Sequence, residues 1–201
     1  MKIINFSNYT FLFLILVLQT YPIFSQAHPK VLKSKVTGVG TVNGKGEIGN
    51  AIFTKESTTK DQKSYPALNE LSFSAGSAEN FHVRFFYTAK LKDAVAYIKS
   101  RQSNATDIEY NTSCQIYDGD NQKYGSGSTF YPYENDFAEW NTSRVEAQEM
   151  EFLPKINELS AGSYQIFCDV KMSYKYYDSA SMSDKSHFIL IASGKIPLKI
   201  N

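Results

Sequence analysis

Short segments in which apolar and polar residues alternate recur along this chain, and they limit its fold more than any other feature. A period of two places one side of a strand on a core and the other on solvent. The pattern predicts strands at 47–54, 68–74, 81–87, 110–117, 145–153, 164–174 and 188–200. Several short strands with polar turns and few helices favour an all-β fold over alternating βαβ units. We expect an immunoglobulin-like antiparallel β-sandwich.

Two turns and one ambiguous segment complete this pattern. Asn43-Gly44 and the Asp-Gly-Asp-Asn sequence at 118–121 are typical of hairpin turns, because these residues tolerate positive φ angles. Between the turns, four apolar residues have the spacing of one helix face: Leu91, Ala94, Val95 and Ile98. The same residues also fit a turn followed by a strand. Flanks rich in Phe, Tyr and Val favour the strand, which we predict here.

The start of the chain has the layout of a secretory signal peptide. Lys2 precedes an unbroken apolar run at 11–18, which is short for a membrane span, and small residues follow at Ser25 and Ala27. We predict a signal peptide at 1–27 and one β-sandwich domain at 28–201, secreted or periplasmic. Cleavage after Ala27 gives His28 a free α-amine, whereas cleavage after Ser25 or Gln26 does not.

Charge and cysteine content restrict the function further. The chain has 21 basic and 20 acidic residues, a balance that argues against electrostatic capture of nucleic acid or an anionic membrane. After the leader, no apolar stretch approaches the length of a membrane span. The two cysteines, Cys114 and Cys168, are expected to form a disulfide in an oxidising compartment. Soft metal ligation is the alternative, although the chain has no CxxC spacing.

Catalytic motifs are missing from the sequence. It contains no G-x-S-x-G, HExxH or Walker loop, and only three histidines, His28, His82 and His187. His82 has the opposite parity to Phe81 and Val83, so we expect it to face outward from its strand. Asp118 and Asp120 fit a plain β-turn better than a calcium loop. We therefore predict no enzymatic activity.

Aromatic residues and glycosylation sequons are the remaining candidates for contact with partners. An aromatic cluster in a segment with proline and acidic residues can stack on sugars, anchor a protein partner, or pack down on the sandwich; it comprises Tyr131, Tyr133, Phe137 and Trp140. Asn104, Asn111 and Asn141 each begin an N-x-S/T sequon. These sequons predict N-glycosylation if the source is a eukaryote.

Both ends of the predicted domain carry a further pattern. His28-Pro29-Lys30 opens it, Leu-Ser-Ala-Gly-Ser-Tyr stands at 159–164, Ser-Asp-Lys-Ser-His at 183–187, and Gly194 leads the final strand. In these segments the chain resembles copper-handling proteins of the CopC type, which are small periplasmic Greek-key sandwiches. The resemblance implies a Cu(II) site formed by the amine and imidazole of His28 with Asp184 and His187. The chain departs from the family in its greater length, the spacing of Asp184 and His187, and the missing Met-rich segment.

These observations lead to three functional expectations. The first is an exported, non-catalytic binding protein that recognises a protein or glycan partner through its loops. The alternative is a copper-handling protein that binds Cu(II) through His28, Asp184 and His187, whose mixed N and O donors suit that ion. The third is a copper-dependent polysaccharide oxygenase, in which His82 or His187 joins His28 as the second brace ligand.

Overall fold

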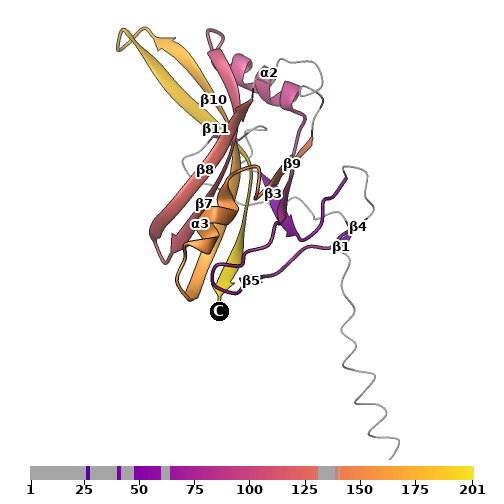
Figure 1. Ribbon diagram of the computed structural model, residues 1–201. Coiled ribbons are helices and arrows are strands. Elements are labelled where there is room, and N and C mark those ends of the chain that lie inside the picture. Colours follow the sequence, from indigo (N-terminus) through magenta and orange to yellow (C-terminus); the bar gives the residue numbers. More distant parts are fainter. Residues whose placement is uncertain (1–25, 28–39, 42–47, 60–63, 131–138, 140) are drawn as a thin grey trace, which may run out of the picture.

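A computed structural model describes residues 26–27, 40–41, 48–59, 64–130, 139 and 141–201. The all-β prediction is confirmed, because strands make up most of the described chain (Figure 1). The elements are β1 (Gln26–Ala27), β2 (Gly40–Thr41), β3 (Gly49–Thr54), β4 (Ser64–Tyr65), β5 (Leu71–Phe73), β6 (His82–Phe86), α2 (Leu91–Arg101), β7 (Thr106–Asp118), β8 (Asn121–Phe130), β9 (Thr142–Glu146), α3 (Phe152–Asn157), β10 (Gly162–Asp178) and β11 (Ser183–Ile200). No described helix is both long and apolar enough to cross a bilayer.

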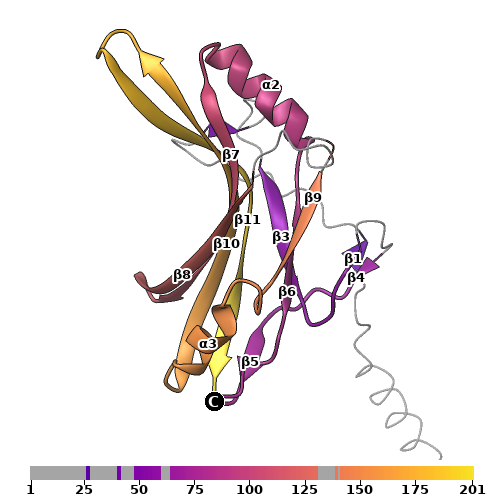
Figure 2. The same cartoon turned by 45° about the horizontal axis from the view of Figure 1, so that its top comes forward.

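One nine-stranded sheet organises the fold. Its order is β8-β7-β10-β11-β3-β6-β9, and β2 and β5 also pair with β11. The pairs of β11 with β2, β3 and β5 are parallel, whereas the other pairs in this sheet are antiparallel. The sheet curls around its core, with α2 and α3 beside it (Figure 2). The division of the strands into two facing layers stays a prediction.

A second, two-stranded sheet contains the residues next to the predicted cleavage site. Gln26 and Ala27 of β1 pair with Tyr65 and Ser64 of β4. Cleavage after Ala27 would remove β1 and leave β4 without this partner. The signal peptide and the domain boundary at residue 27 stay predictions.

The core follows from the alternation seen in the sequence. In β7 every second residue from Ile108 to Ile116 is buried, including Tyr110 and Cys114, while the residues between them are half-buried. In β10, Ile166, Cys168, Val170 and Met172 are buried on the matching side. Helix α2 contributes Leu91, Ala94 and Ile98 to the same core, and α3 contributes Phe152 and Ile156.

The strand predicted around residues 91–98 is wrong, because Leu91–Arg101 is a helix. Leu91, Ala94 and Ile98 point to one side and are fully buried, as the helical spacing requires. Asp93 lies in the first turn, and Lys99 and Arg101 lie in the last, where these charges complement the helix dipole. The strand predicted at 145–153 is also only partly correct, since β9 ends at Glu146 and α3 begins at Phe152.

The hairpin turn at 118–121 is confirmed. Asp118 pairs with Asn121, so Gly119 and Asp120 form a two-residue connection between β7 and β8. Gly119 has a φ of 57°, a left-handed conformation that glycine adopts without steric cost. The turn predicted at Asn43-Gly44 lies outside the described residues.

The predicted disulfide is confirmed between Cys114 and Cys168. These residues lie directly opposite each other in β7 and β10, with a Cα–Cα distance of 4.0 Å. Both are fully buried. The bond therefore joins neighbouring strands of one sheet, at the centre of the core.

A group of three hydroxyls lies within this apolar core. The side chains of Tyr87, Tyr110 and Ser143 are hydrogen-bonded to one another, with 2.6 Å between Tyr110 Oη and Ser143 Oγ. Burial raises the pKa of Tyr87 well above its usual value and also raises the pKa of Tyr110. Both phenols are therefore neutral hydrogen-bonding groups in the folded protein.

Candidate functional site

The predicted copper ligands Asp184 and His187 both lie in the first part of β11, and both are exposed. They are three residues apart in a regular ladder, in which Asp184 pairs with Tyr177 and His187 with Tyr174. Successive side chains of a strand alternate between its faces, so these two point to opposite faces. This placement does not favour a shared ion. His28 lies outside the described residues, and the copper site stays a prediction.

Metal ligation finds no other support in the described part of the chain. There, no group of three or more His, Cys, Asp or Glu side chains is arranged to hold an ion.

The predicted aromatic cluster also lies outside the described residues. Its members are Tyr131, Tyr133, Phe137 and Trp140. The three sequon asparagines can be placed. Asn104 is exposed between α2 and β7, and Asn141 is exposed just before β9. Asn111 is half-buried within β7, where its Nδ2 donates to Ser173 Oγ at 2.8 Å. Glycosylation itself stays a prediction.

The structure reveals a different candidate surface at the far end of β10 and β11. We call residues 174–188 the distal hairpin. The ladder between β10 and β7 ends at Lys175, and β11 meets β2 only from Ile189 onward. Between these points the two strands pair only with each other among the described residues. The distal hairpin therefore projects from the rest of the sheet (Figures 1 and 2).

Exposed hydrophobic side chains concentrate on the distal hairpin. Within the described chain, the large hydrophobic residues that remain exposed are Tyr177 (49%), Met182 (79%) and Phe188 (41%). Tyr177 and Phe188 lie on one face, since they pair with Asp184 and Ser173 in a continuous ladder. Met182 lies in the turn at the tip. Large exposed apolar side chains that cluster are a common mark of interaction sites.

The opposite face of the distal hairpin carries a second set of rings. The ring of Tyr174 lies 6.1 Å from that of Tyr176 and 5.7 Å from that of His187, measured between centroids. Tyr174 is nearly buried, Tyr176 is half-buried and His187 is exposed. Burial raises the pKa of Tyr174. On this face, Tyr174 and Tyr176 pack toward the core and the His187 ring is exposed.

Ion pairs neutralise the lysines of this region. Lys175 Nζ lies 3.2 Å from Asp107 Oδ2, and Lys185 pairs with Asp178 across the hairpin. At its base, Lys171 Nζ lies 2.7 Å from Asp169 Oδ2 and 5.4 Å from the centre of the Phe188 ring. The surface is consequently aromatic and nearly neutral, and it has little attraction for phosphate-rich ligands.

The turn of the distal hairpin is ordered by Asp178. This carboxylate accepts hydrogen bonds from the Ala180 backbone N–H at 3.1 Å and from Ser181 Oγ at 2.8 Å. The bond from Lys185, followed by those from Ser181 and Ala180, lowers the pKa of Asp178 to about 2. Asn104 supports the hairpin from the side, because its Nδ2 donates to the Tyr177 carbonyl at 2.9 Å.

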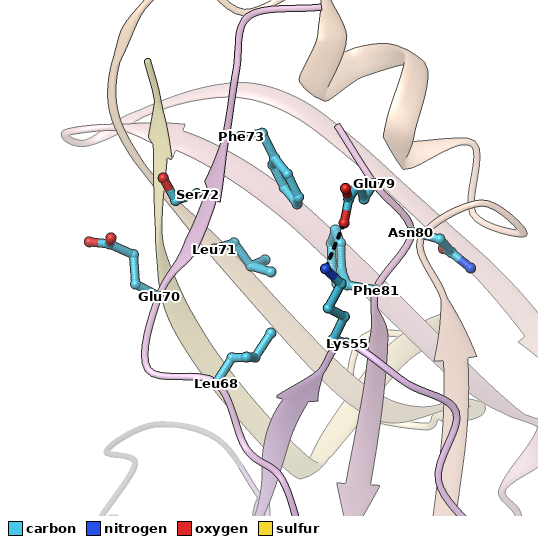
Figure 3. A pocket seen from close by; sticks show the side chains of 9 residues that line it. All are labelled: Lys55, Leu68, Glu70, Leu71, Ser72, Phe73, Glu79, Asn80 and Phe81. Carbon is cyan, nitrogen blue, oxygen red and sulfur yellow. Dashed lines mark ion pairs between the residues drawn. The ribbon is translucent and has the colours of Figure 1, made fainter. Parts of the chain in front are cut away.

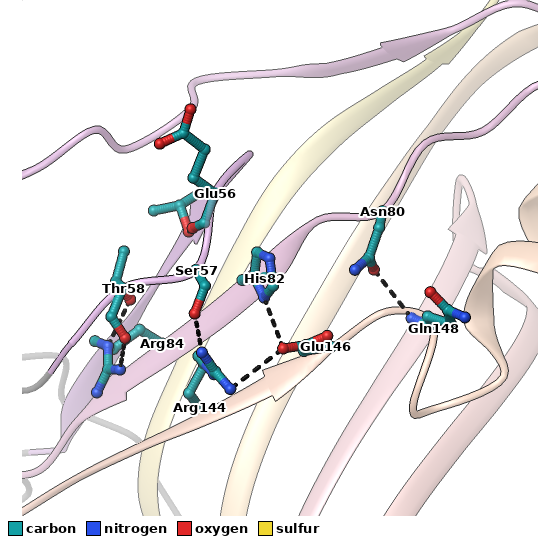
Figure 4. A network of polar contacts seen from close by, with 10 residues as sticks. Glu56, Ser57, Thr58, Asn80, His82, Arg84, Arg144, Glu146 and Gln148 are labelled. Atoms are coloured by element: carbon teal, nitrogen blue, oxygen red, sulfur yellow. Dashed lines mark hydrogen bonds and ion pairs between the residues drawn. The ribbon is translucent and has the colours of Figure 1, made fainter.

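A polar cluster lies on the outer side of β6 and β9 (Figure 4). Glu146 Oε1 lies 3.2 Å from Arg144 Nη2 and 3.5 Å from His82 Nδ1. His82 faces away from the core, as predicted, yet it is only 7% exposed. Its Nδ1 has an ion-pair contact but no hydrogen-bond partner among the described residues.

This cluster contains a serine, a histidine and a carboxylate, yet it lacks the contact that a hydrolase needs. Arg144 donates a hydrogen bond to Ser57 Oγ, and no bond joins Ser57 to His82 in the described chain. A nucleophilic serine requires a base within hydrogen-bond distance.

The hydrogen bonds that Arg84 makes beside this cluster have a structural role. Its guanidinium is buried and donates to Thr58 Oγ1 at 2.6 Å, to the Thr58 carbonyl and to Thr142 Oγ1 at 3.2 Å. Burial lowers the pKa of Arg84. These bonds hold residues 57–58 against the outer side of β6 and β9.

A small cavity of about 260 Å³ lies beside β5 (Figure 3). Leu71, Phe73 and Phe81 form its apolar wall, and the Lys55–Glu79 ion pair, at 2.9 Å, crosses its rim. Pockets for small molecules usually start at about 300 Å³. The size of this cavity and its neutralised rim make it a weaker candidate than the distal hairpin.

No family model matches the chain, and no curated protein matches it.

Proposed function

We propose that this chain is an exported binding protein without catalytic activity, and that it recognises a protein partner through the distal hairpin. The observation that carries this proposal is the concentration of exposed large hydrophobic residues on one projecting hairpin. Aromatic residues and Met are enriched in protein interfaces, and a few residues, with Tyr prominent among them, carry most of the binding energy.

The order of the hairpin supports the proposal. Tyr174–Asp178 and Ser183–His187 pair continuously, and the Asp178 contacts fix the connecting turn. A preorganised surface loses less conformational entropy on binding than a flexible loop does. The side chains that face a partner are therefore presented on a supported backbone.

The balance of charge favours a protein over a polyanion. Lys175 and Lys185 already have acidic partners, so the exposed rings have little net charge around them. Met182 at the tip adds a flexible apolar side chain, which adapts to the irregular surface of a protein. The disulfide and the predicted signal peptide support export to an oxidising compartment.

The test is saturable binding of the labelled, oxidised protein to the cell surface of its source organism. We expect the double variant Tyr177→Ser with Phe188→Ser to lose most of this binding. Tyr117→Ser is the matched control, because it removes a half-exposed ring from β7 at the other end of the sheet. Protease treatment of the cells should abolish binding and glycosidase treatment should not.

Three results would contradict the proposal. The first is the absence of saturable binding by the wild-type protein. The second is equal loss in the hairpin variant and the Tyr117 control. The third is loss only in Tyr133→Ala with Trp140→Ala, which would place the binding surface on the predicted aromatic loop. Equal thermal midpoints for all variants establish that each is folded.

A further inference from the structure

The outer edge of β8 is a second candidate interaction surface, independent of the distal hairpin. β8 is the terminal strand of the sheet, and its outer edge has no partner among the described residues. Figure 2 shows it at the margin of the sheet. An edge strand presents alternate N–H and C=O groups that are ready to pair with another strand.

The sequence of β8 lacks the usual protection of an edge. From Tyr124 to Phe130 it contains no charged residue and no proline, and it includes Gly125 and Gly127. This stretch pairs regularly with β7, and the irregularity in the ladder comes before it, between Tyr124 and Gln122. Lys123 lies at that irregularity and contacts Asp118 Oδ2 at 3.4 Å. Natural proteins usually guard long edges with charges, proline or bulges.

Two other free edges of the sheet carry charged residues. β9, at the opposite margin, has only five residues, and two of them are Arg144 and Glu146. The free part of β11 carries Lys185 near its middle, so two copies paired about that residue would oppose it to Lys185 of the second copy. Like charges directly opposite in a ladder are destabilising.

We infer that β8 pairs with β8 of a second copy of this chain, in an antiparallel ladder across a two-fold axis. In such a pair, two residues that lie opposite each other point to the same face of the sheet, whereas neighbours along one strand point to opposite faces. Opposed residues are therefore an even number of positions apart, and the two-fold axis passes through the residue midway between them. The midpoint of the regular stretch is Gly127. Ser126 then lies opposite Ser128 of the second copy, and Gly125 lies opposite Thr129. No like charges meet, and one sheet continues through both copies.

Because the contact is a single strand pair, it forms a concentration-dependent dimer. The wild-type, oxidised protein should approach twice the monomer mass in light scattering or sedimentation as its concentration rises. A protein that stays monomeric at every soluble concentration would overturn the inference, even if β8 captured a strand of another protein.

Two matched variants test the register. Gly125→Lys with Thr129→Lys places two like-charged pairs across the axis, whereas Gly125→Glu with Thr129→Lys places two opposite-charged pairs at the same positions. A Cβ at position 125 approaches the flexible end of Gln122 at 2.8 Å and Gln115 Cγ at 3.4 Å, on side chains that can shift, and it lies in ordinary contact, at 3.8 Å, with the Cys114 carbonyl oxygen. We expect the Lys/Lys variant to dimerise roughly tenfold more weakly than the Glu/Lys variant.

Equal dimerisation of the two variants would refute the Gly127-centred pairing. Matching thermal midpoints exclude unfolding as the cause of any difference. The hairpin variants Tyr177→Ser and Phe188→Ser should dimerise like the wild type, so failure of this inference is distinguishable from failure of the proposed function.

Discussion

Reduction of the Cys114–Cys168 disulfide should lower the free energy of unfolding by about 4 kcal/mol. The bond closes a loop across a sequence separation of 54 residues. In the chain-entropy model, a closed loop of this length removes roughly 14 cal/mol/K from the unfolded chain, which is about 4 kcal/mol at 25 °C. A domain is usually stable by only about 5–15 kcal/mol. The reduced protein should therefore be marginally folded.

Urea unfolding of the oxidised and reduced wild-type chains measures this effect directly. The two samples differ only in the bond, so no core atom other than two thiol hydrogens changes. We expect a lower midpoint after reduction, and a native disulfide that resists mild reductants because both cysteines are fully buried. The double variant Cys114→Ala with Cys168→Ala should lose additional stability, since it also removes two buried sulfurs.

Coincident urea midpoints for the oxidised and reduced chains would refute this reasoning. Rapid reduction under native conditions would contradict the burial of the bond. Thiol counting on each sample confirms its redox state before the unfolding is interpreted.

Three further predictions concern polar groups. Tyr87→Phe should cost about 1 kcal/mol in urea unfolding, because it removes one member of the hydroxyl group formed with Tyr110 and Ser143. In the wild type, the raised pKa values of both tyrosines mean that their contribution is complete below the usual value of 10.0. It falls as pH rises above that value, because the unfolded phenols ionise first; absorbance titration should show late ionisation coupled to unfolding. Asp178→Asn should speed amide exchange at Ala180, whose N–H donates to the carboxylate. In the wild type, the turn should lose the support of the ionised carboxylate as pH falls from 3.8 toward about 2. Unchanged exchange would contradict the role of the carboxylate. Arg84→Ala should destabilise the fold by about 2 kcal/mol and expose residues 57–58 to limited proteolysis, whereas Arg101→Ala, on an exposed helix end, should have little effect.

The strands with apolar alternation could be predicted from the sequence, but the distal hairpin could not. The pattern marked 164–174 and 188–200, which hold the buried residues of β10 and β11. From Lys175 to His187, strand formation depends on pairing between the two segments, without an apolar face to mark it. The sequence features that indicate a hairpin here are the aromatic residues Tyr176 and Tyr177, which extend the strand, and the turn-forming residues within 178–181 that follow them.

Residues 91–98 illustrate a different difficulty. Local composition favoured a strand, whereas the spacing of Leu91, Ala94 and Ile98 fitted the helix that forms. The spacing decided the outcome because one helix face buries all three side chains in the core. For the candidate site, exposure of Tyr177 and Phe188 depends on where the ladders to β7 and β2 end, and sequence alone does not specify this.

The central position of β11 has a consequence for the order of events during biosynthesis. β11 follows every other described strand in the chain, yet it joins β10 to β3, by pairing Gly49 with Ala192. The strands on either side therefore cannot become one sheet until β11 has been synthesised. Contacts between such distant residues slow folding. Premature termination before residue 183 should leave two unjoined sheet fragments for the quality-control machinery to degrade.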